Sequence, residues 1–449
     1  MFTRLFSIAA VATLTLAAFT VKAQTNSTVL AAIPAAKTET KADAKTEATA
    51  TTPEKKAAED TSWKPQRRIW GYVFGDLYYN AHADKTNRGG ESMYNGVPQY
   101  RNAFQFRRIY LGYDYEITKK FKVELLLASE PNANTGVNGS TSIQNGDNLV
   151  DGKMAFWIKN ANLRVRDLWN GTDLVIGEQG TPGFALNEPG TNGPTTLSEA
   201  TWGYRSIEKT ITDFHKNNSY DLGASLQGTF DPATKNFGYV LMVGNNSTSS
   251  LLSAANANTG FYKMFYGDLW GKFLDKKLYV DIYADYLKTS PSSTAIPDGQ
   301  NHNMFKIFAA YNTKPISVGV EAYTQKFASG VNKAGTPEDA TAQGFTIWAK
   351  GAISKTLNYF ARFDAYQPDT KFDPTASYTV NTNYGSYNPT VKENFYTFGL
   401  DYQPAKGVHF EPNVWLIDYK DNRNASTAGY VAPDHNLVFR ATVYYVFGK

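Results

Sequence analysis

The sequence predicts an all-β protein, a transmembrane antiparallel β-barrel of about sixteen strands. Three observations carry this prediction: runs of about ten residues in which apolar and polar side chains alternate, connections that alternate between short and long, and an unusual residue usage. Aromatic residues make up 14% of the 449 residues, with 29 Tyr and 27 Phe, and there are 35 Gly. Aromatic residues are enriched in strands and glycine in tight turns, so this usage favours a β-rich fold over a helical one.

Composition also excludes several kinds of site. The chain has no cysteine, so it can hold no disulfide, thiolate metal site or cysteine nucleophile. Its five histidines are scattered along the sequence, and we therefore expect no zinc cluster, no other metal site and no cofactor. The 45 basic and 41 acidic residues are too evenly balanced for a nucleic-acid-binding protein.

Residues 1–23 are predicted to be a secretory signal peptide. Arg4 begins a short positive region, an apolar run follows over 7–19, and small residues precede a cleavage site after Ala23. The apolar run is shorter than the roughly 20 residues that a membrane-spanning helix needs. We therefore expect an exported protein, and any membrane crossing by the mature chain would have to use strands.

Residues 24–62 are predicted to form a flexible periplasmic segment. They are almost all Ala, Thr, Lys, Glu, Asp and Pro, and they contain no aromatic residue. Such a segment buries too little apolar surface to offset the entropy lost on ordering. A coiled coil is the alternative, but no seam of apolar a and d positions is visible. The composition changes at Trp63, and the barrel is expected to span 63–449.

Sixteen alternating runs lie between Trp63 and the C-terminus. In 121–129, for example, Phe121, Val123 and Leu125 share one face while Lys122 and Glu124 share the other. Period-two alternation of this kind predicts strands with one apolar and one polar face. The runs lie near 69–80, 103–116, 121–129, 152–166, 173–179, 221–230, 236–245, 261–273, 278–288, 303–312, 316–327, 343–353, 357–366, 394–403, 408–420 and 437–447.

The connections between these runs alternate in length, which a soluble β-sandwich has no reason to do. Short periplasmic turns and longer outer loops are the pattern of outer-membrane barrels, whose strands need about 9–11 residues to cross the bilayer. Aromatic residues near run ends, such as Trp70, Tyr402 and Tyr445, are candidates for interfacial girdles. The short connections are 117–120, 167–172, 231–235, 274–277, 313–315, 354–356 and 404–407, and the long ones lie near 81–102, 130–151, 180–220, 246–260, 289–302, 328–342, 367–393 and 421–435.

A barrel of sixteen strands predicts a function by its size alone. Barrels of about 16–18 strands leave an aqueous channel, so we expect a porin for passive diffusion of small polar solutes rather than an enzyme. The longest loop, 180–220, is the candidate constriction, because charges on an in-folded loop would set the field that a permeating ion meets. A solvated surface loop is the alternative. The candidate constriction residues are Arg205, Glu208, Lys209, Asp213 and His215.

Strand parity places a set of basic residues in the lumen. A cationic side chain facing lipid near the bilayer midplane costs about 2–4 kcal/mol, so the wet face is its expected location. Rings of cations favour anions, while Asp281, Asp285 and Asp364 on the same face oppose them, and we predict a weak anion preference. Arg107 has the wrong parity, which a bulge or a subunit interface would explain. The lumenal candidates are Arg108, Lys122, Arg164, Arg166, Lys350, Arg362 and Arg440.

Several short segments match one protein family in order and spacing over about 100–230. They are Phe106-Arg107-Arg108-Ile109-Tyr110-Leu111-Gly112 followed by Phe121-Lys122-Val123-Glu124-Leu125, then Ala161-Asn162-Leu163-Arg164-Val165, Leu174-Val175-Ile176-Gly177-Glu178-Gln179, Thr181-Pro182-Gly183-Phe184 and Tyr204-Arg205-Ser206. By these motifs the chain resembles the phosphate-selective porin O and P family. The resemblance implies a sixteen-stranded, often homotrimeric porin with a basic eyelet in the outer membrane of a Gram-negative bacterium. The family's arginine ladder and eyelet lysines have no residue-by-residue match in this sequence.

Three other functions remain open at this point. A substrate-specific channel, for example for sugars, would use the many tyrosines for stacking, and saturable block by one solute would identify it. A secreted glycan-binding protein or hydrolase would use a carboxylate pair such as Asp281 and Asp285, and it would dissolve without detergent. An adhesin or assembly barrel would bind a periplasmic partner through 24–62. The expected partners of the favoured function are membrane lipid and small anions or other polar solutes, without nucleic acid.

Overall fold

The computed structural model describes most of the chain beyond Trp63. The described residues are 63–86, 88, 97–129, 149–150, 153–154, 156–183, 202, 204, 215, 219–246, 262–288, 301–380 and 389–448. The predicted signal peptide, 1–23, and the predicted flexible segment, 24–62, lie outside them. Within these ranges no helix is both long and apolar enough to cross a membrane.

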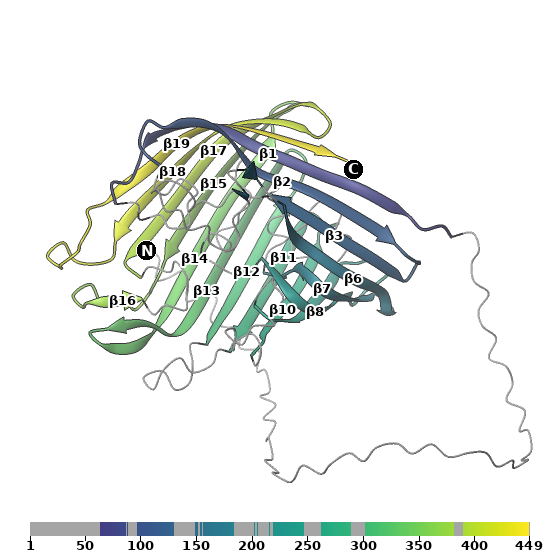
Figure 1. Ribbon diagram of the computed structural model, residues 1–449, viewed down its shortest axis with the longest axis horizontal. Coiled ribbons are helices and arrows are strands. Elements are labelled where there is room, and N and C mark those ends of the chain that lie inside the picture. Colours follow the sequence, from purple (N-terminus) through teal and green to yellow (C-terminus); the bar gives the residue numbers. More distant parts are fainter. Residues whose placement is uncertain are drawn as a thin grey trace, which may run out of the picture. The chain divides into compact units, whose positions relative to one another are not determined.

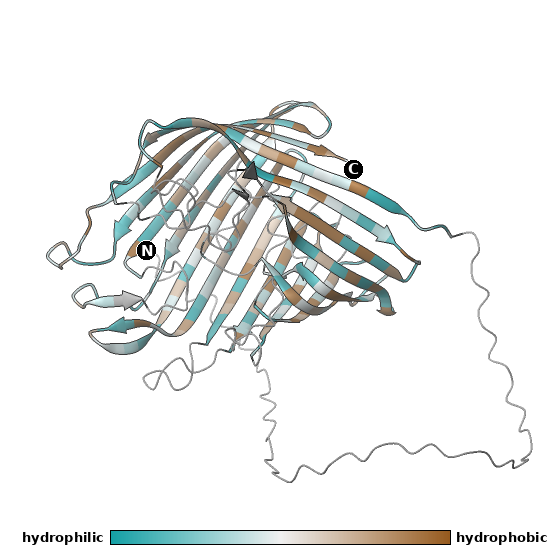
Figure 2. Ribbon diagram, in the orientation of Figure 1, coloured by the Kyte–Doolittle hydropathy of each residue, from teal (hydrophilic) through white to brown (hydrophobic). Residues whose placement is uncertain are grey.

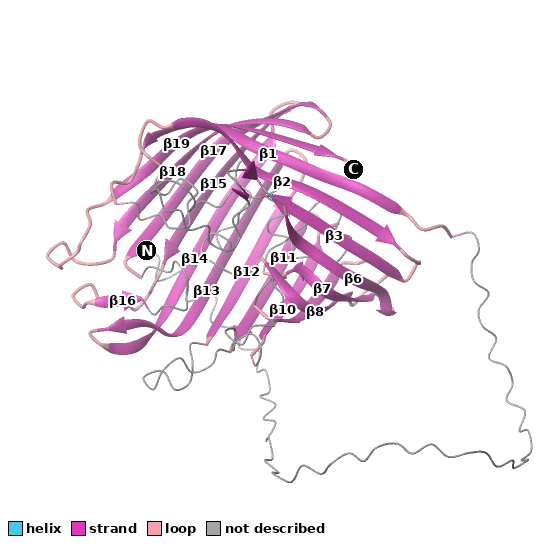
Figure 3. Cartoon of the chain, viewed as in Figure 1, coloured by secondary structure: helices cyan, strands magenta, loops and turns pink. Residues whose placement is uncertain are grey.

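Strands make up most of the described residues (Figure 3). Sixteen of them form one closed ring, and each predicted run corresponds to one of the sixteen. Their bounds are β1 (Arg67–His82), β2 (Asn102–Glu116), β3 (Phe121–Ser129), β6 (Trp157–Trp169), β7 (Thr172–Gly180), β8 (Tyr220–Thr229), β9 (Phe237–Gly244), β10 (Met264–Phe273), β11 (Leu278–Leu287), β12 (His302–Asn312), β13 (Ile316–Lys333), β14 (Thr336–Ala352), β15 (Leu357–Gln367), β17 (Val391–Ala405), β18 (Val408–Asp421) and β19 (Asp434–Phe447).

The ring closes between its first and last strands. Each strand pairs antiparallel with the next, and β1 pairs with β19 from Gly71 opposite Phe447 to His82 opposite Leu437 (Figure 1). Closure leaves no edge strand with unpaired backbone groups, which is what a sheet in lipid requires. The predicted antiparallel barrel of sixteen strands is therefore confirmed. Three short strands lie outside the ring: β4 (Leu149–Val150), β5 (Lys153–Met154) and β16 (Tyr378–Val380).

One predicted long loop, 328–342, is wrong, because most of it is strand. β13 runs on to Lys333 and β14 begins at Thr336, so only Ala334 and Gly335 form the turn. Both have positive φ, 49° and 91°, as a two-residue hairpin turn of the primed type requires. In the fold this segment extends a hairpin beyond the ring, where β16 pairs with β13.

Side chains from the following loop dock on the extended hairpin. Lys333 on β13 lies 3.2 Å from Asp373, measured from ammonium nitrogen to carboxylate oxygen. The Thr375 hydroxyl and backbone amide, together with Lys333, lower the pKa of the Asp373 carboxyl to about 2. These charge-assisted contacts connect the extended hairpin to the loop that follows β15.

The two faces of the barrel wall differ in chemistry, and the alternation is visible along the strands in Figure 2. On β11, Ile282 is 44% exposed, and its cross-strand neighbour Ile307 on β12 is exposed to the same extent, whereas Asp281 is fully buried on the opposite face. An apolar outer face of this extent is the surface that lipid covers in a spanning barrel. The exposed apolar side chains include Leu77, Leu111, Ile176, Leu241, Leu269, Ile282, Ile307, Val318, Ile347, Phe398, Phe439 and Val443.

The aromatic residues near strand ends divide between the two faces. Tyr402 and Tyr445 are exposed on the outer face and remain girdle candidates. Trp70 is only 2% exposed and lies on the inner face. Its indole packs across β2 at Gly112, where an added Cβ would lie 2.1 Å from the ring. The girdle prediction for Trp70 is therefore wrong, because period two turns it inward.

Replacing Ile282 by arginine should destabilise the barrel, because it places a charge on the apolar outer face in the middle of a strand. The expected loss is about 2–4 kcal/mol in the free energy of unfolding. Urea unfolding in lipid vesicles, followed by heat-modifiable migration, measures it. Leu274→Arg in the short turn of the same hairpin is the matched control, and we expect at most about 1 kcal/mol there. Equal losses at both positions would contradict the assignment of the outer face to lipid.

Candidate functional site

The inner face of the barrel carries the predicted basic residues. The seven lumenal candidates lie on β2, β3, β6, β14, β15 and β19, on the face of the wall opposite the exposed apolar side chains. Arg108, Arg166 and Lys350 are half-buried. The other four, Lys122, Arg164, Arg362 and Arg440, are buried. Whether they line an open path for ions stays a prediction.

Most of these cations are matched by carboxylates on the same wall. Lys122 and Glu124 are 2.8 Å apart, and Arg164 lies 3.6 Å from Glu124 and 3.2 Å from Asp173. These contacts join β3, β6 and β7 into a chain of ion pairs across the strands. Two further pairs, Arg166 with Glu116 and Arg362 with Asp364, each measure 2.6 Å. Pairing of this kind fixes the side chains and reduces the charge they present to a solute.

A different arrangement surrounds Asp76, where two arginines share one carboxylate. Arg440 on β19 donates to Asp76 on β1 at 2.8 Å, and Arg107 on β2 approaches the other carboxylate oxygen at 3.5 Å. Both guanidinium groups also lie over the Trp415 ring, at 4.1 and 5.6 Å from its centroid. All four side chains are buried. This cluster therefore carries one more positive than negative charge.

A β-bulge explains how Arg107 reaches the inner face. Along β1 and β2 the register changes from Phe74 opposite Arg108 to Gly75 opposite Phe106, so Arg107 is the extra residue. Because a bulge adds one residue, the residues before and after it alternate between the two faces with opposite parity. Arg107 and Arg108 therefore both lie inside. Simple alternation misplaced Arg107, and of the two explanations left open the bulge is correct.

A second bulge brings a lysine inside that the sequence did not single out. On β6 the register changes from Asn160 opposite Leu126 to Ile158 opposite Leu127, and both Lys159 and Asn160 are buried. The Lys159 ammonium group donates to the Tyr110 hydroxyl, to which Arg108 also donates, at 2.9 Å. Two cations from β2 and β6 therefore meet at one phenol. The sequence carries no signal for this bulge, because 152–166 alternates weakly.

Described residues of the longest loop, 180–220, contact the wall opposite the strand from which the loop begins. The loop leaves β7, and β15 lies eight places further around the ring of sixteen, on the opposite side. The Lys350 ammonium group on β14 donates to the Trp202 carbonyl at 2.9 Å, and the Trp202 ring packs edge-on against Phe360 of β15 with centroids 5.8 Å apart. His215 stacks on Tyr366 of β15 at 3.5 Å. The described residues of the loop thus contact the far wall.

Other described parts of loop 180–220 lie against the inner face as well. Near its start, the Gly183 carbonyl accepts a hydrogen bond from Lys306 on β12. Tyr204 stacks on Phe360 at 4.5 Å, and the His215 imidazole lies 3.8 Å from the Glu393 carboxylate. Of the five predicted constriction residues only His215 falls within the described ranges. Arg205, Glu208, Lys209 and Asp213 lie outside them.

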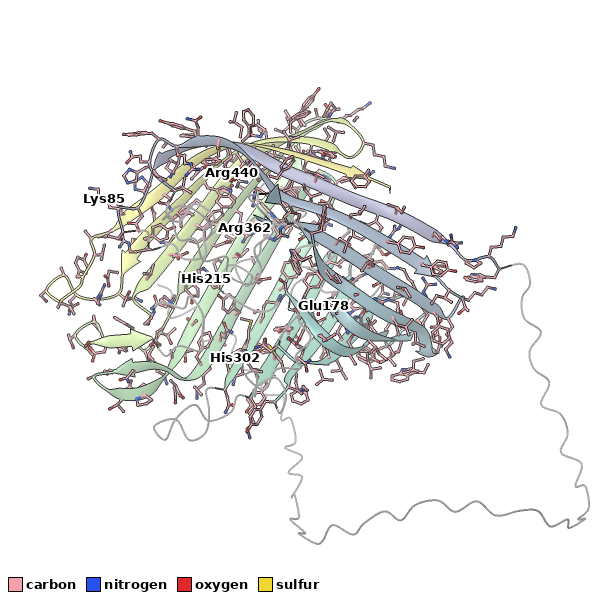
Figure 4. All side chains as sticks on the ribbon, viewed as in Figure 1. Lys85, Glu178, His215, His302, Arg362 and Arg440 are labelled. Atoms are coloured by element: carbon pink, nitrogen blue, oxygen red, sulfur yellow. The ribbon has the colours of Figure 1, made fainter. Side chains whose placement is uncertain are left out.

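On β7 to β13 six buried acidic side chains accompany one buried basic side chain, Lys306. Glu178 is 5% exposed, and on the part of the chain that the structure describes its carboxylate oxygens accept no hydrogen bond. Glu178, Arg362 and Arg440 are labelled in Figure 4. Sequence reasoning found Asp281 and Asp285 but missed the rest, because their strands alternate less clearly. The buried acidic side chains on β7 to β13 are Glu178, Asp221, Asp268, Asp281, Asp285 and Glu321.

The possible acid–base pair on β11 does not have catalytic spacing. Asp281 and Asp285 both face inward, four residues apart on one straight strand. At about 3.3 Å per residue their backbones are about 13 Å apart. Glycosidases hold their two carboxyl groups about 5–10 Å apart. Because of this spacing, the pair no longer supports the alternative that the protein is a hydrolase.

The fold is similar to solved outer-membrane porins. An anion-selective porin from Comamonas acidovorans is 12% identical over 86% of this chain and 100% of that chain, with a TM-score of 0.50. OmpT from Vibrio cholerae, in its trimer form, is 11% identical over 85% and 99%, with a TM-score of 0.49. OmpF from Salmonella typhi, in complex with daunomycin, is 12% identical over 85% and 97%, with a TM-score of 0.49.

No protein-family model matches the sequence, and no curated protein matches it. At 12% identity the likeness to the Comamonas porin shows the fold alone.

Replacing Trp202 by alanine should release the loop from the opposite wall. Loss of a buried tryptophan costs about 3–5 kcal/mol of packing, which weakens the docking of the loop on β14 and β15. We expect the variant to have a higher single-channel conductance in planar bilayers than the unchanged protein. The smallest poly(ethylene glycol) that is excluded from its pore should also be larger. Trp169→Ala is the control, because Trp169 is exposed at the end of β6. An unchanged size cut-off in Trp202→Ala would mean that the loop does not limit the pore.

Proposed function

We infer that the protein is a porin of the outer membrane of a Gram-negative bacterium, through which small polar solutes diffuse passively. The observation that carries this inference is the closed ring of sixteen strands with an apolar outer face and a charged inner face. Rings of this size enclose more space than their own side chains fill. The predicted signal peptide and the lipid-compatible outer face support the location. A channel needs no catalytic residues, and none is proposed.

The proposed channel prefers anions weakly. The support comes from β2, β6 and β19, where Arg107 and Arg440 share the carboxylate of Asp76 and where Arg108 and Lys159 meet at the Tyr110 hydroxyl. Cationic side chains along a pore favour anions and phosphate. The acid-rich strands β7 to β13 limit the preference, and the ion pairs of Lys122, Arg164, Arg166 and Arg362 reduce it further.

Phosphate is the first anion to test. The motifs around Arg108, Arg164 and Thr181 resemble the phosphate-selective porin O and P family, and that resemblance is the support for phosphate and for a homotrimer. In this proposal Arg108 and Lys159, which meet at Tyr110, have the role of the family's basic eyelet. Native mass analysis of the protein in detergent measures the number of subunits.

A substrate-specific channel is the second candidate. Four tyrosines on the inner face favour it, spread over β10, β11, β13 and β15: Tyr266, Tyr283, Tyr323 and Tyr366. A row of aromatic rings can stack on the apolar faces of sugar rings. Saturable block of the current by one sugar, with no comparable block by phosphate, would favour this candidate.

The proposed selectivity is tested by the reversal potential across a KCl gradient, with phosphate added afterwards. We expect an anion-selective potential and a current that phosphate reduces. In the Arg108→Ser, Lys159→Ser double variant the potential should shift toward cations. One unit charge about 4 Å from a permeating ion is worth about 1 kcal/mol in water, or about a fivefold change in relative permeability.

Lys120→Ser is the matched control for this experiment, because Lys120 is exposed in a short turn. It removes a positive charge without touching the inner cluster, and the potential should stay unchanged. An equal shift in the control would assign the selectivity to the rim. Large steps without selectivity or block would leave a general porin, and the absence of steps would favour a closed or ligand-binding barrel.

A further inference from the structure

Two of the five histidines meet at the outer end of the barrel seam. His82 ends β1, and His435 is the second residue of β19, so the two belong to the first and last strands of the ring. Their rings stack with centroids 4.1 Å apart and planes inclined by 23°. Lys85, labelled in Figure 4, marks this end of the barrel, which lies away from the C-terminus. The histidines are scattered in the sequence, but ring closure brings these two together.

A carboxylate completes the group. The Asp434 Oδ1 atom lies 2.7 Å from His82 Nε2 and 3.9 Å from His435 Nδ1. One potential ligand atom from each residue lies within 4.8 Å of those of the other two. In a tetrahedral zinc site with bonds of about 2.0–2.1 Å, ligand atoms are about 3.4 Å apart. Small rotations of partly exposed side chains close this difference, since the His82 and His435 side chains are 27% and 40% exposed.

The backbone around the group already holds the carboxylate in place. The Lys85 amide donates to Asp434 Oδ2 at 3.1 Å, and the His435 amide donates to Oδ1 at 2.9 Å. One residue further along the strand, the Asn436 side-chain oxygen accepts from the Asp84 amide at 2.6 Å. Hydrogen bonds that orient a ligand raise metal affinity in known sites. The chain that follows His82 is thus fixed to the start of β19.

We propose that His82, Asp434 and His435 bind a divalent transition-metal ion, with zinc as the ion of best fit, which joins β1 to β19 at the outer rim. Two imidazoles and one carboxylate suit zinc, copper and nickel better than calcium or magnesium. Three protein ligands on a partly exposed rim leave a fourth position to water. The ion links residues 352 positions apart in sequence, and cross-links that close long loops remove the most entropy from the unfolded chain.

Zinc titration of the purified full-length protein in detergent tests the proposal, using isothermal calorimetry and the temperature of heat-modifiable migration. We expect one saturable site per chain, and a higher unfolding temperature with zinc than with a chelator. His82→Ala and His435→Ala should each weaken zinc binding by about 10–100-fold or more and remove the zinc-dependent rise in unfolding temperature. Copper bound to the wild type should show two coordinated imidazole nitrogens by electron paramagnetic resonance.

A second group of three possible metal ligands among the described residues supplies the control. His409 lies 2.9 Å from Asp401 on the inner face of β17 and β18, with Glu411 beside it. His409→Ala should leave zinc binding unchanged if the rim is the site. Loss of binding in His409→Ala, unaltered binding in the His82→Ala, His435→Ala double variant, or no saturable binding in the wild type would each overturn the proposal. Metal binding is measured without conductance, so its outcome is independent of the proposed porin function.

Discussion

The backbone hydrogen-bond pairing between the first and last strands, β1 and β19, is the interaction on which the rest of this structure depends. In a bilayer no water is available to satisfy an open sheet edge, and each unsatisfied backbone group costs several kcal/mol. Pairing of β1 with β19 removes both edges at once. Closure then divides every strand between lipid and interior, because successive side chains point to opposite faces. The apolar belt, the charged inner wall and the meeting of residues from both ends of the chain all follow.

The interior charges are arranged locally rather than as simple rings. Where carboxylates oppose cations on neighbouring strands, as between Lys122 and Glu124, the charges form pairs. Where a bulge adds a residue to one strand, as at Arg107 and Lys159, cations accumulate around Asp76 and Tyr110. Bulges aim side chains that alternation would send into lipid. The local imbalance of charge in the proposed channel is therefore produced by irregularities of the sheet.

The described residues of the long loop after β7 lie against the opposite wall. Trp202 and His215 pack on β14, β15 and β17, where they meet aromatic side chains, the Lys350 ammonium group and the Glu393 carboxylate. The wall thus serves both to carry charge and to dock the loop.

The sequence by itself determined the strands, the face of most side chains and the alternation of short turns with long connections. These features are local: period two and turn residues act over a few positions, so the number of strands and the inward placement of Lys122, Arg164 and Arg440 could be predicted. The two bulges, the hairpin at Ala334 and Gly335, and the inward position of Trp70 could not, because they depend on the register against a neighbouring strand. Only the closed ring brings His82 to Asp434 and Trp202 to Phe360, since such contacts are set by which strands become neighbours or face each other across the barrel.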